Sequence, residues 1–303
     1  MSVSTSEKEA RPASPAFALL VAIRPLEWTK NAFVFAPVIF SGNLTSPPAV
    51  ISAATAFIAL CMAASATYLL NDVRDREADR AHPTKCHRPI AAGVIAPRHA
   101  ILMASVLGLT GIALAFTVNR FTGFGVFGYL ALTTLYSMAL KGVVILDVVT
   151  LACGFVLRVI VGSVAIGVQF SAWLVLCTFM LALFLGFGKR RNELTLLEGK
   201  AIDHRPILGE YSPQFLDLMM SVVTTAAVMS YVMYTMDPDT MAHFGSAHLV
   251  YTSVFVLYGI FRYLYLIHKR SFGGNPAQAL YRDTSLLLAV FCWIASILLM
   301  RYL

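Results

Sequence analysis

This sequence has few of the charged residues that cover a soluble protein. Only 13% of its 303 residues are Asp, Glu, Lys or Arg, whereas 58% are hydrophobic and the mean hydropathy is +0.73. A soluble domain usually carries about 25% charged residues. The composition therefore excludes a soluble globular protein and predicts an integral membrane protein.

Cysteine spacings typical of metal or redox sites are also missing. The five cysteines form no CxxC pair and four of them lie in apolar stretches, so we expect neither a disulfide nor a zinc site. The N-terminal MSVSTSEKEARPASP is polar and lacks the basic-then-apolar pattern of a secretory signal. We expect residues 1–16 to be a disordered tail and residues 17–303 to form one domain.

Long apolar runs occupy most of the chain. Stretches of about 20 apolar residues are long enough to span a bilayer as helices. Nine are found, at 17–41, 48–70, 98–118, 122–140, 143–167, 171–188, 213–236, 247–267 and 284–302. The sequence therefore predicts an all-α polytopic membrane protein with nine transmembrane helices.

Lys and Arg are distributed unevenly between the two sides of this topology. All but three of the 23 fall on the side of the N-terminus, the exceptions being Arg120, Arg158 and Arg301. The positive-inside rule therefore places the N-terminus in the cytoplasm, and we expect a multi-pass protein of the cell (inner) membrane. The net charge of +7 reflects this bias and an attraction to anionic membrane lipids, so we expect no nucleic-acid partner.

The densest polar segment is NDVRDREADRAHPTKCHRPIAAG, residues 71–93. If it is helical, Asp72, Asp75 and Asp79 share one face. Like charges on one face repel, so the spacing favours a divalent cation, with Asn71 as a further oxygen ligand. Magnesium fits, because it takes one or two carboxylates and completes its shell with water and phosphate. A solvated cytoplasmic loop with compensating charges is the alternative.

This segment resembles the first aspartate-rich signature of the UbiA-type superfamily of intramembrane prenyltransferases. Its longer form, with His82, Pro83, Lys85, Arg88 and Gly93, is similar to the branch of decaprenyl-phosphate phosphoribosyltransferases. The resemblance implies a UbiA-like helical fold around a cytoplasm-facing cavity, Mg²⁺ as cofactor and a role in cell-wall biosynthesis. It also implies transfer of 5-phosphoribose from 5-phosphoribosyl-1-diphosphate to a polyprenyl (decaprenyl) phosphate.

Two further motifs resemble the same branch. RPLEWTKN interrupts the first apolar run, either as a short interfacial segment or as a helix whose polar face lines a cavity. The resemblance implies that Lys30 and Asn31 face the site, although Lys30 as a snorkelling residue beside Trp28 is an equal alternative. In YSMALK the resemblance implies that Tyr136 and Lys141 face a phosphate.

The fifth apolar run contains two charges, Asp147 and Arg158. They lie 11 residues apart, about 16 Å along a helix, so they cannot pair with each other. A charge at this depth is costly unless it faces a polar interior. Each therefore needs another partner, and we expect both to face a cavity.

The sixth run ends in KRRNE, residues 189–193, where most of the superfamily carries a second aspartate-rich motif. A cluster of Lys189, Arg190 and Arg191 beside Glu193 suits an anion better than a second magnesium. We expect these three cations to bind the acceptor's phosphate. A positive-inside anchor is the alternative reading.

Together these motifs predict a membrane-embedded, Mg-dependent glycosyl (phosphoribosyl) transferase. We expect Asp72, Asp75 and Asp79 to be catalytic and to bind magnesium with Asn71. The expected donor-binding residues are Asn71, Lys85, Arg88, Lys30, Tyr136 and Lys141. Supporting roles are expected for Asn31, Asp147, Arg158, Glu193 and Asp283.

Two other functions remain open on the sequence alone. One is a UbiA-type aromatic prenyltransferase that uses polyprenyl diphosphate. The other is a transporter, although no inverted repeat with broken helices is found. A homo-oligomer also remains open. Because Asp72 and Asp75 are expected outside the packed spans, replacing either should abolish activity without unfolding the protein.

Overall fold

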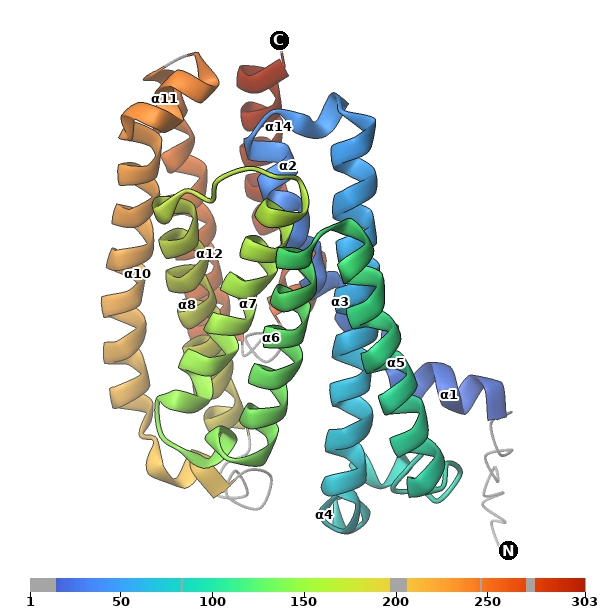
Figure 1. Ribbon diagram of the computed structural model, residues 1–303. Helices are drawn as coiled ribbons and strands as arrows, with labels where there is room; N and C mark the ends of the chain where they lie inside the picture. Colours follow the sequence, from blue (N-terminus) through green and yellow to red (C-terminus); the bar gives the residue numbers. More distant parts are fainter. Residues whose placement is uncertain (1–14, 83, 197–205, 246, 271–275, 303) are drawn as a thin grey trace, which may run out of the picture.

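The part of the chain described by the computed structural model, residues 15–82, 84–196, 206–245, 247–270 and 276–302, contains helices and no strand (Figure 1). Seven of the described helices are long and apolar enough to cross a membrane. They are α3 (Pro47–Arg74), α5 (Pro97–Val118), α7 (Leu146–Ala165), α8 (Ala172–Leu196), α10 (Pro213–Met236), α12 (Ser253–Arg270) and α14 (Thr284–Tyr302). The expected all-α membrane architecture is confirmed.

The shorter elements connect these helices. They are α4 (Arg76–Ala81), η2 (Asn43–Thr45), η3 (Lys85–His87), η4 (Leu140–Gly142), η5 (Pro206–Glu210), α11 (Pro238–Phe244), η6 (Ala247–Thr252) and α13 (Pro276–Arg282). Proline opens α3, α5 and α10, where its missing N–H costs nothing. The predicted tail over 1–16 lies almost entirely outside the described residues.

Two of the nine predicted spans are not among the seven. Helix α6 (Arg120–Met138) has 19 residues, but its glycines and threonines make it less apolar. A single helix over 17–41 is wrong: the chain forms α1 (Pro15–Ile23), a 3₁₀ helix η1 (Pro25–Phe35) and α2 (Ala36–Phe40). Arg24, with φ 53°, breaks the helix ahead of Pro25.

Element η1 packs tightly against α7. A Cβ on Gly162 would lie 2.1 Å from the carbonyl O of Val34, so only glycine allows this approach. Nearby, Trp28 donates to the Ser65 hydroxyl at 3.0 Å and so joins η1 to α3. The irregular segment is thereby attached to the bundle, with Asn31 and Val34 as its buried residues.

The long helices run side by side, and the C-terminal ends of α3, α6 and α8 all lie at the lower end of the view in Figure 1. One hydrophobic core joins α7, α8, α10 and α12, and another joins α3, α6 and α7. The polar motifs from three separate parts of the sequence are therefore brought to one end of the bundle.

Candidate active site

The aspartate-rich segment is not one continuous helix. Helix α3 ends at Arg74, and α4 begins at Arg76 after Asp75 leaves the helical region at φ −87°, ψ 8°. Asp72 and Asp79 are buried, at 2% and 4% exposed, whereas Asp75 is half-buried. The condition of one continuous helix is therefore not met, and Asp75, at the break, does not share the burial of the other two carboxylates.

Arg88 connects the two buried carboxylates. Its Nη1 lies 3.2 Å from Oδ1 of Asp72 and 2.7 Å from Oδ2 of Asp79. The guanidinium of Arg24 also pairs with Asp72 and lies over the Tyr68 ring, 5.0 Å from its centroid. Sequence reasoning missed this role of Arg24, although the RPLEWTKN motif offered the signal.

Asp75 has a different partner. Lys141, from η4, places its Nζ 2.8 and 2.9 Å from the two oxygens of Asp75. Beside it, Arg74 donates to the carbonyl oxygens of Ser137 and Met138 and so ties the end of α3 to the end of α6. We call Asp72, Asp75 and Asp79, with Arg24, Arg88 and Lys141, the aspartate site.

Oxygen ligands suited to magnesium are present in the aspartate site, but they are not preassembled as one cluster. Among the described residues, no three His, Cys, Asp or Glu side chains are grouped as a metal site. Asp72 and Asp79 do converge on a single cation, Arg88. Two such carboxylates, completed by water and substrate phosphate, fit the coordination that magnesium prefers.

Asp147 and Arg158 each have their own partners, as expected from their spacing. Asp147 is fully buried; its Oδ2 accepts from Arg190 Nε at 2.8 Å and its Oδ1 from the Tyr211 hydroxyl at 2.7 Å. Burial and the hydrogen bond to Asp147 raise the pKa of Tyr211 to about 12, so its hydroxyl stays protonated. Sequence reasoning did not single out Tyr211.

Arg158 is 6% exposed and donates to Oδ1 of Asn31 at 2.7 Å and to the Tyr129 hydroxyl at 2.8 Å. Its partners in the described part of the chain are neutral, and its guanidinium also lies over the rings of Tyr129 and Phe155. Asn31 in turn donates to the Cys61 sulfur. Arg158 thus joins α7 to η1 and α6.

The three cations of the KRRNE segment have different surroundings. Arg190 is 1% exposed and pairs with Asp147 and Glu193, and Arg191 pairs with Asp217 at 2.8 Å. Lys189 lies 3.7 Å from Glu193, and 44% of its side chain is exposed. Lys30 and Glu27, which pair with each other, lie close enough to act on its charge, Lys30 by repulsion and Glu27 by attraction.

The remaining predicted residues take local roles. Lys85 donates its N–H to Nδ1 of His82, which shapes the turn after α4. Tyr136 lies half-buried in the last turn of α6. Asp283 pairs with Arg262 and accepts the N–H of Leu286 at the start of α14, as a helix cap does.

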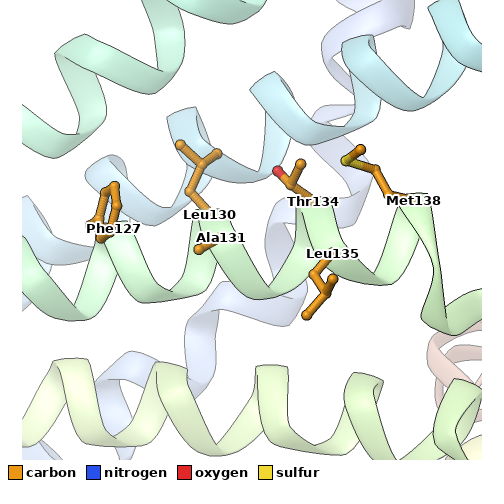
Figure 2. Close-up of a pocket in the computed structure, with 6 residues that line it drawn as sticks. All are labelled: Phe127, Leu130, Ala131, Thr134, Leu135 and Met138. Carbon is orange, nitrogen blue, oxygen red and sulfur yellow. The ribbon is translucent and has the colours of Figure 1, made fainter.

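An open apolar groove of about 340 Å³ runs along α6 (Figure 2). It is lined by Phe127, Leu130, Ala131, Thr134, Leu135 and Met138. Met138 closes α6, and its carbonyl oxygen accepts from Arg74, the residue before Asp75. The groove therefore extends from the exposed apolar surface of the bundle toward its polar end.

A bundle of helices long and apolar enough to cross a membrane, with buried carboxylates and arginines at one end, defines a multi-pass membrane protein with a polar site at one end of the bundle. More narrowly, the chain belongs to the UbiA prenyltransferase family, whose model matches residues 32–281. The expected family and UbiA-like fold are confirmed.

The relatives and a solved structure agree with this assignment. The chain is 32% identical to the decaprenyl-phosphate phosphoribosyltransferase of Corynebacterium glutamicum, over 99% of this chain and 92% of the relative. It is 34% identical to the protein of that name from Mycobacterium tuberculosis, over 94% and 95%. A UbiA homolog from Archaeoglobus fulgidus, solved with GPP and Mg²⁺, superposes with a TM-score of 0.70 over 94% of this chain and all of its own. At 18% identity, that likeness shows the fold alone.

Proposed function

We propose that this protein is a Mg-dependent phosphoribosyltransferase. It moves 5-phosphoribose from 5-phosphoribosyl-1-diphosphate to a polyprenyl phosphate, with release of diphosphate. The observation that carries the proposal is the similarity, over 94% and 99% of this chain, to proteins named decaprenyl-phosphate phosphoribosyltransferase. The polar residues of the aspartate site and of the KRRNE segment suit two phosphorylated substrates.

The donor binds at the aspartate site. Asp72 and Asp79 would hold the magnesium ion together with the donor's diphosphate, and Asn71 and Asp75 lie next to them in the sequence. When bound, the ion neutralises charge that builds on the departing diphosphate. Arg24, Arg88 and Lys141, which pair with these carboxylates, turn to the donor's phosphates.

In the reaction, the bond between the anomeric carbon and the diphosphate oxygen breaks, and the electron pair leaves with diphosphate. An oxygen of the lipid phosphate forms the new bond to that carbon. A phosphate monoester has a second pKa of about 6, so the acceptor is ionised near neutral pH and needs no general base. The protein's task is to bind and orient two anions, which cationic side chains do.

The acceptor's phosphate binds to Lys189, with Lys30 beside it. Lys189 is half-exposed and its charge interacts with that of Lys30, whereas Arg190 is buried between two carboxylates. The sequence-based prediction assigned Lys30 to the donor, and we now assign it to the acceptor. It also assigned Arg190 and Arg191 to direct acceptor binding, and we now assign that role to Lys189. These two arginines support Lys189 by fixing the end of α8.

The lipid's isoprenoid chain lies in the apolar groove of α6, whose exposed side chains face the membrane lipids. The groove ends at Met138, whose carbonyl oxygen accepts from Arg74, the residue before Asp75. An isoprenoid chain in the groove therefore brings its phosphate toward the polar end of the bundle. With the N-terminus inside, this end faces the cytoplasm, where a soluble donor is available. We place the protein in the cell (inner) membrane.

An aromatic prenyltransferase is the second candidate, favoured by the fold it shares with a UbiA homolog solved with GPP. One assay separates the two reactions. Purified protein with Mg²⁺ is offered labelled 5-phosphoribosyl-1-diphosphate with polyprenyl phosphate, or polyprenyl diphosphate with 4-hydroxybenzoate. Label entering lipid in the first mixture, and stopping on chelation of the metal, supports our proposal. Product in the second mixture alone overturns it.

A further inference from the structure

Tyr211 occupies an unusual position between two polar motifs. It follows η5, directly before α10, and is 5% exposed. Its hydroxyl donates to Oδ1 of Asp147 at 2.7 Å and accepts the backbone N–H of Ile145 at 2.7 Å. One phenol oxygen thus serves both a buried carboxylate and a backbone group.

The backbone at Ile145 is strained. Its φ is 68° and its ψ is −46°, which is a genuine outlier for a β-branched residue. Such a conformation persists only where its surroundings hold it. The hydrogen bond from the Ile145 N–H to the Tyr211 hydroxyl is one of the contacts that hold it. This bond fixes the end of the segment 139–145.

Segment 139–145 carries Lys141, which pairs with Asp75 in the aspartate site. On its other side, Tyr211 bonds to Asp147, whose second oxygen binds Arg190 of the KRRNE segment. A continuous series of contacts therefore runs from Asp75 to Arg190, with the Tyr211 hydroxyl at its centre.

We infer that Tyr211 is a positioning residue, whose hydroxyl holds Lys141 in place for the donor through Ile145. The inference rests on the proposed function for the identity of the donor, but the contacts themselves are independent of it. Tyr211 contacts none of the carboxylates of the aspartate site, so it acts through the 139–145 segment.

The test is a double-mutant cycle with Tyr211→Phe and Lys141→Ala. We expect Tyr211→Phe to raise the KM for 5-phosphoribosyl-1-diphosphate roughly tenfold, with a smaller change in kcat. In the Lys141→Ala background the same change should have no further effect on that KM, because Tyr211 acts through Lys141. If the two substitutions instead multiply their separate effects on that KM, the inference is wrong.

Tyr231→Phe is the matched control. Tyr231 is also buried, and its hydroxyl has two partners, Thr252 at 2.7 Å and Trp293 at 2.8 Å, in the half of the bundle away from the aspartate site. Both variants should lower the melting temperature, but only Tyr211→Phe should change the donor KM. Equal donor KM values for the two variants would show that Tyr211 is only structural.

Amide hydrogen exchange provides a readout that needs no turnover. Exchange in peptides covering 139–146 should accelerate in Tyr211→Phe and not in Tyr231→Phe, since the Ile145 N–H loses its acceptor. If exchange accelerates in Tyr211→Phe but the native chain shows no transfer activity, the proposed function is refuted and the positioning contact still stands. Unchanged exchange would refute the positioning itself.

Discussion

Arg190 and Asp147, 43 positions apart, form an ion pair in which the two side chains are only 2% and 0% exposed. The guanidinium reaches a second carboxylate, Glu193, at 2.8 Å. A cation surrounded in this way stabilises the junction of α7 and α8. It therefore differs from the adjacent Lys189, whose side chain is 44% exposed.

Arg190→Ala should destabilise the protein, because it leaves Asp147 as a buried carboxylate without its cation. Removing one partner of a buried ion pair costs about 3–5 kcal/mol. Lys189→Ala should change the free energy of unfolding by less than about 0.5 kcal/mol and raise the KM for polyprenyl phosphate. Thermal unfolding in detergent and acceptor titrations measure the two effects. An equally destabilising Lys189→Ala would contradict the distinction.

Asp72→Asn and Asp75→Asn should differ in stability although both abolish transfer. Asp72 lies in the last turn of α3 and is buried against Arg24 and Arg88, so its neutralisation leaves Arg24 without its carboxylate and Arg88 with Asp79 alone. Asp75 pairs with Lys141 near the surface. We therefore expect a clear drop in melting temperature for Asp72→Asn and little change for Asp75→Asn. For Asp72 this prediction differs from the sequence-based expectation, which placed both residues outside the packed spans and expected neither change to unfold the protein.

Gly162→Ala should separate η1 from α7. The added Cβ would meet the Val34 carbonyl oxygen at 2.1 Å, and overpacking of this kind costs about 1–3 kcal/mol. Gly128→Ala in α6 is the matched control, because its Cβ meets nothing within 4 Å. That variant should be neutral or more stable by up to about 1 kcal/mol, since alanine favours helix. Melting temperatures of the two variants decide the matter, and equal values would argue against the close packing.

Arg158→Met should lower stability by about 1–3 kcal/mol, because Asn31 and Tyr129 lose their buried hydrogen-bond partner. Arg158→Lys should recover little, since an ammonium lacks the fork that reaches both groups. Unfolding measurements give the energies. Donor and acceptor KM values should stay near those of the native chain, and a large change in either would mean that Arg158 contacts substrate.

Composition and hydropathy were enough to predict a helical membrane bundle, because a run of about 20 apolar residues is typical of a membrane-spanning helix. The broken first segment was not predictable in detail. Pro25 indicated an interruption of the helix. The left-handed backbone conformation of Arg24 and the 3₁₀ helix after it, however, depend on contacts with α3 and α7. Those contacts come from residues far away in the sequence.

The members of the site were largely recognisable from motifs, but their pairing was not. Asp75 meets Lys141, 66 positions away, and this follows from how α3 and α6 pack. Likewise, neighbouring residues on a helix point about 100° apart, so KRRNE could not reveal which cation is buried. Tyr211 gave no signal, because its role depends on the strained backbone of Ile145.

The aspartate site carries three carboxylates and three side-chain cations in direct contact, so its formal charges cancel without any ion. An electroneutral cluster is far less costly to bury beside lipid than a net charge of three. The chain can therefore insert into the bilayer and fold before it meets magnesium. Assembly of this protein is then independent of the magnesium ion that we propose for its reaction.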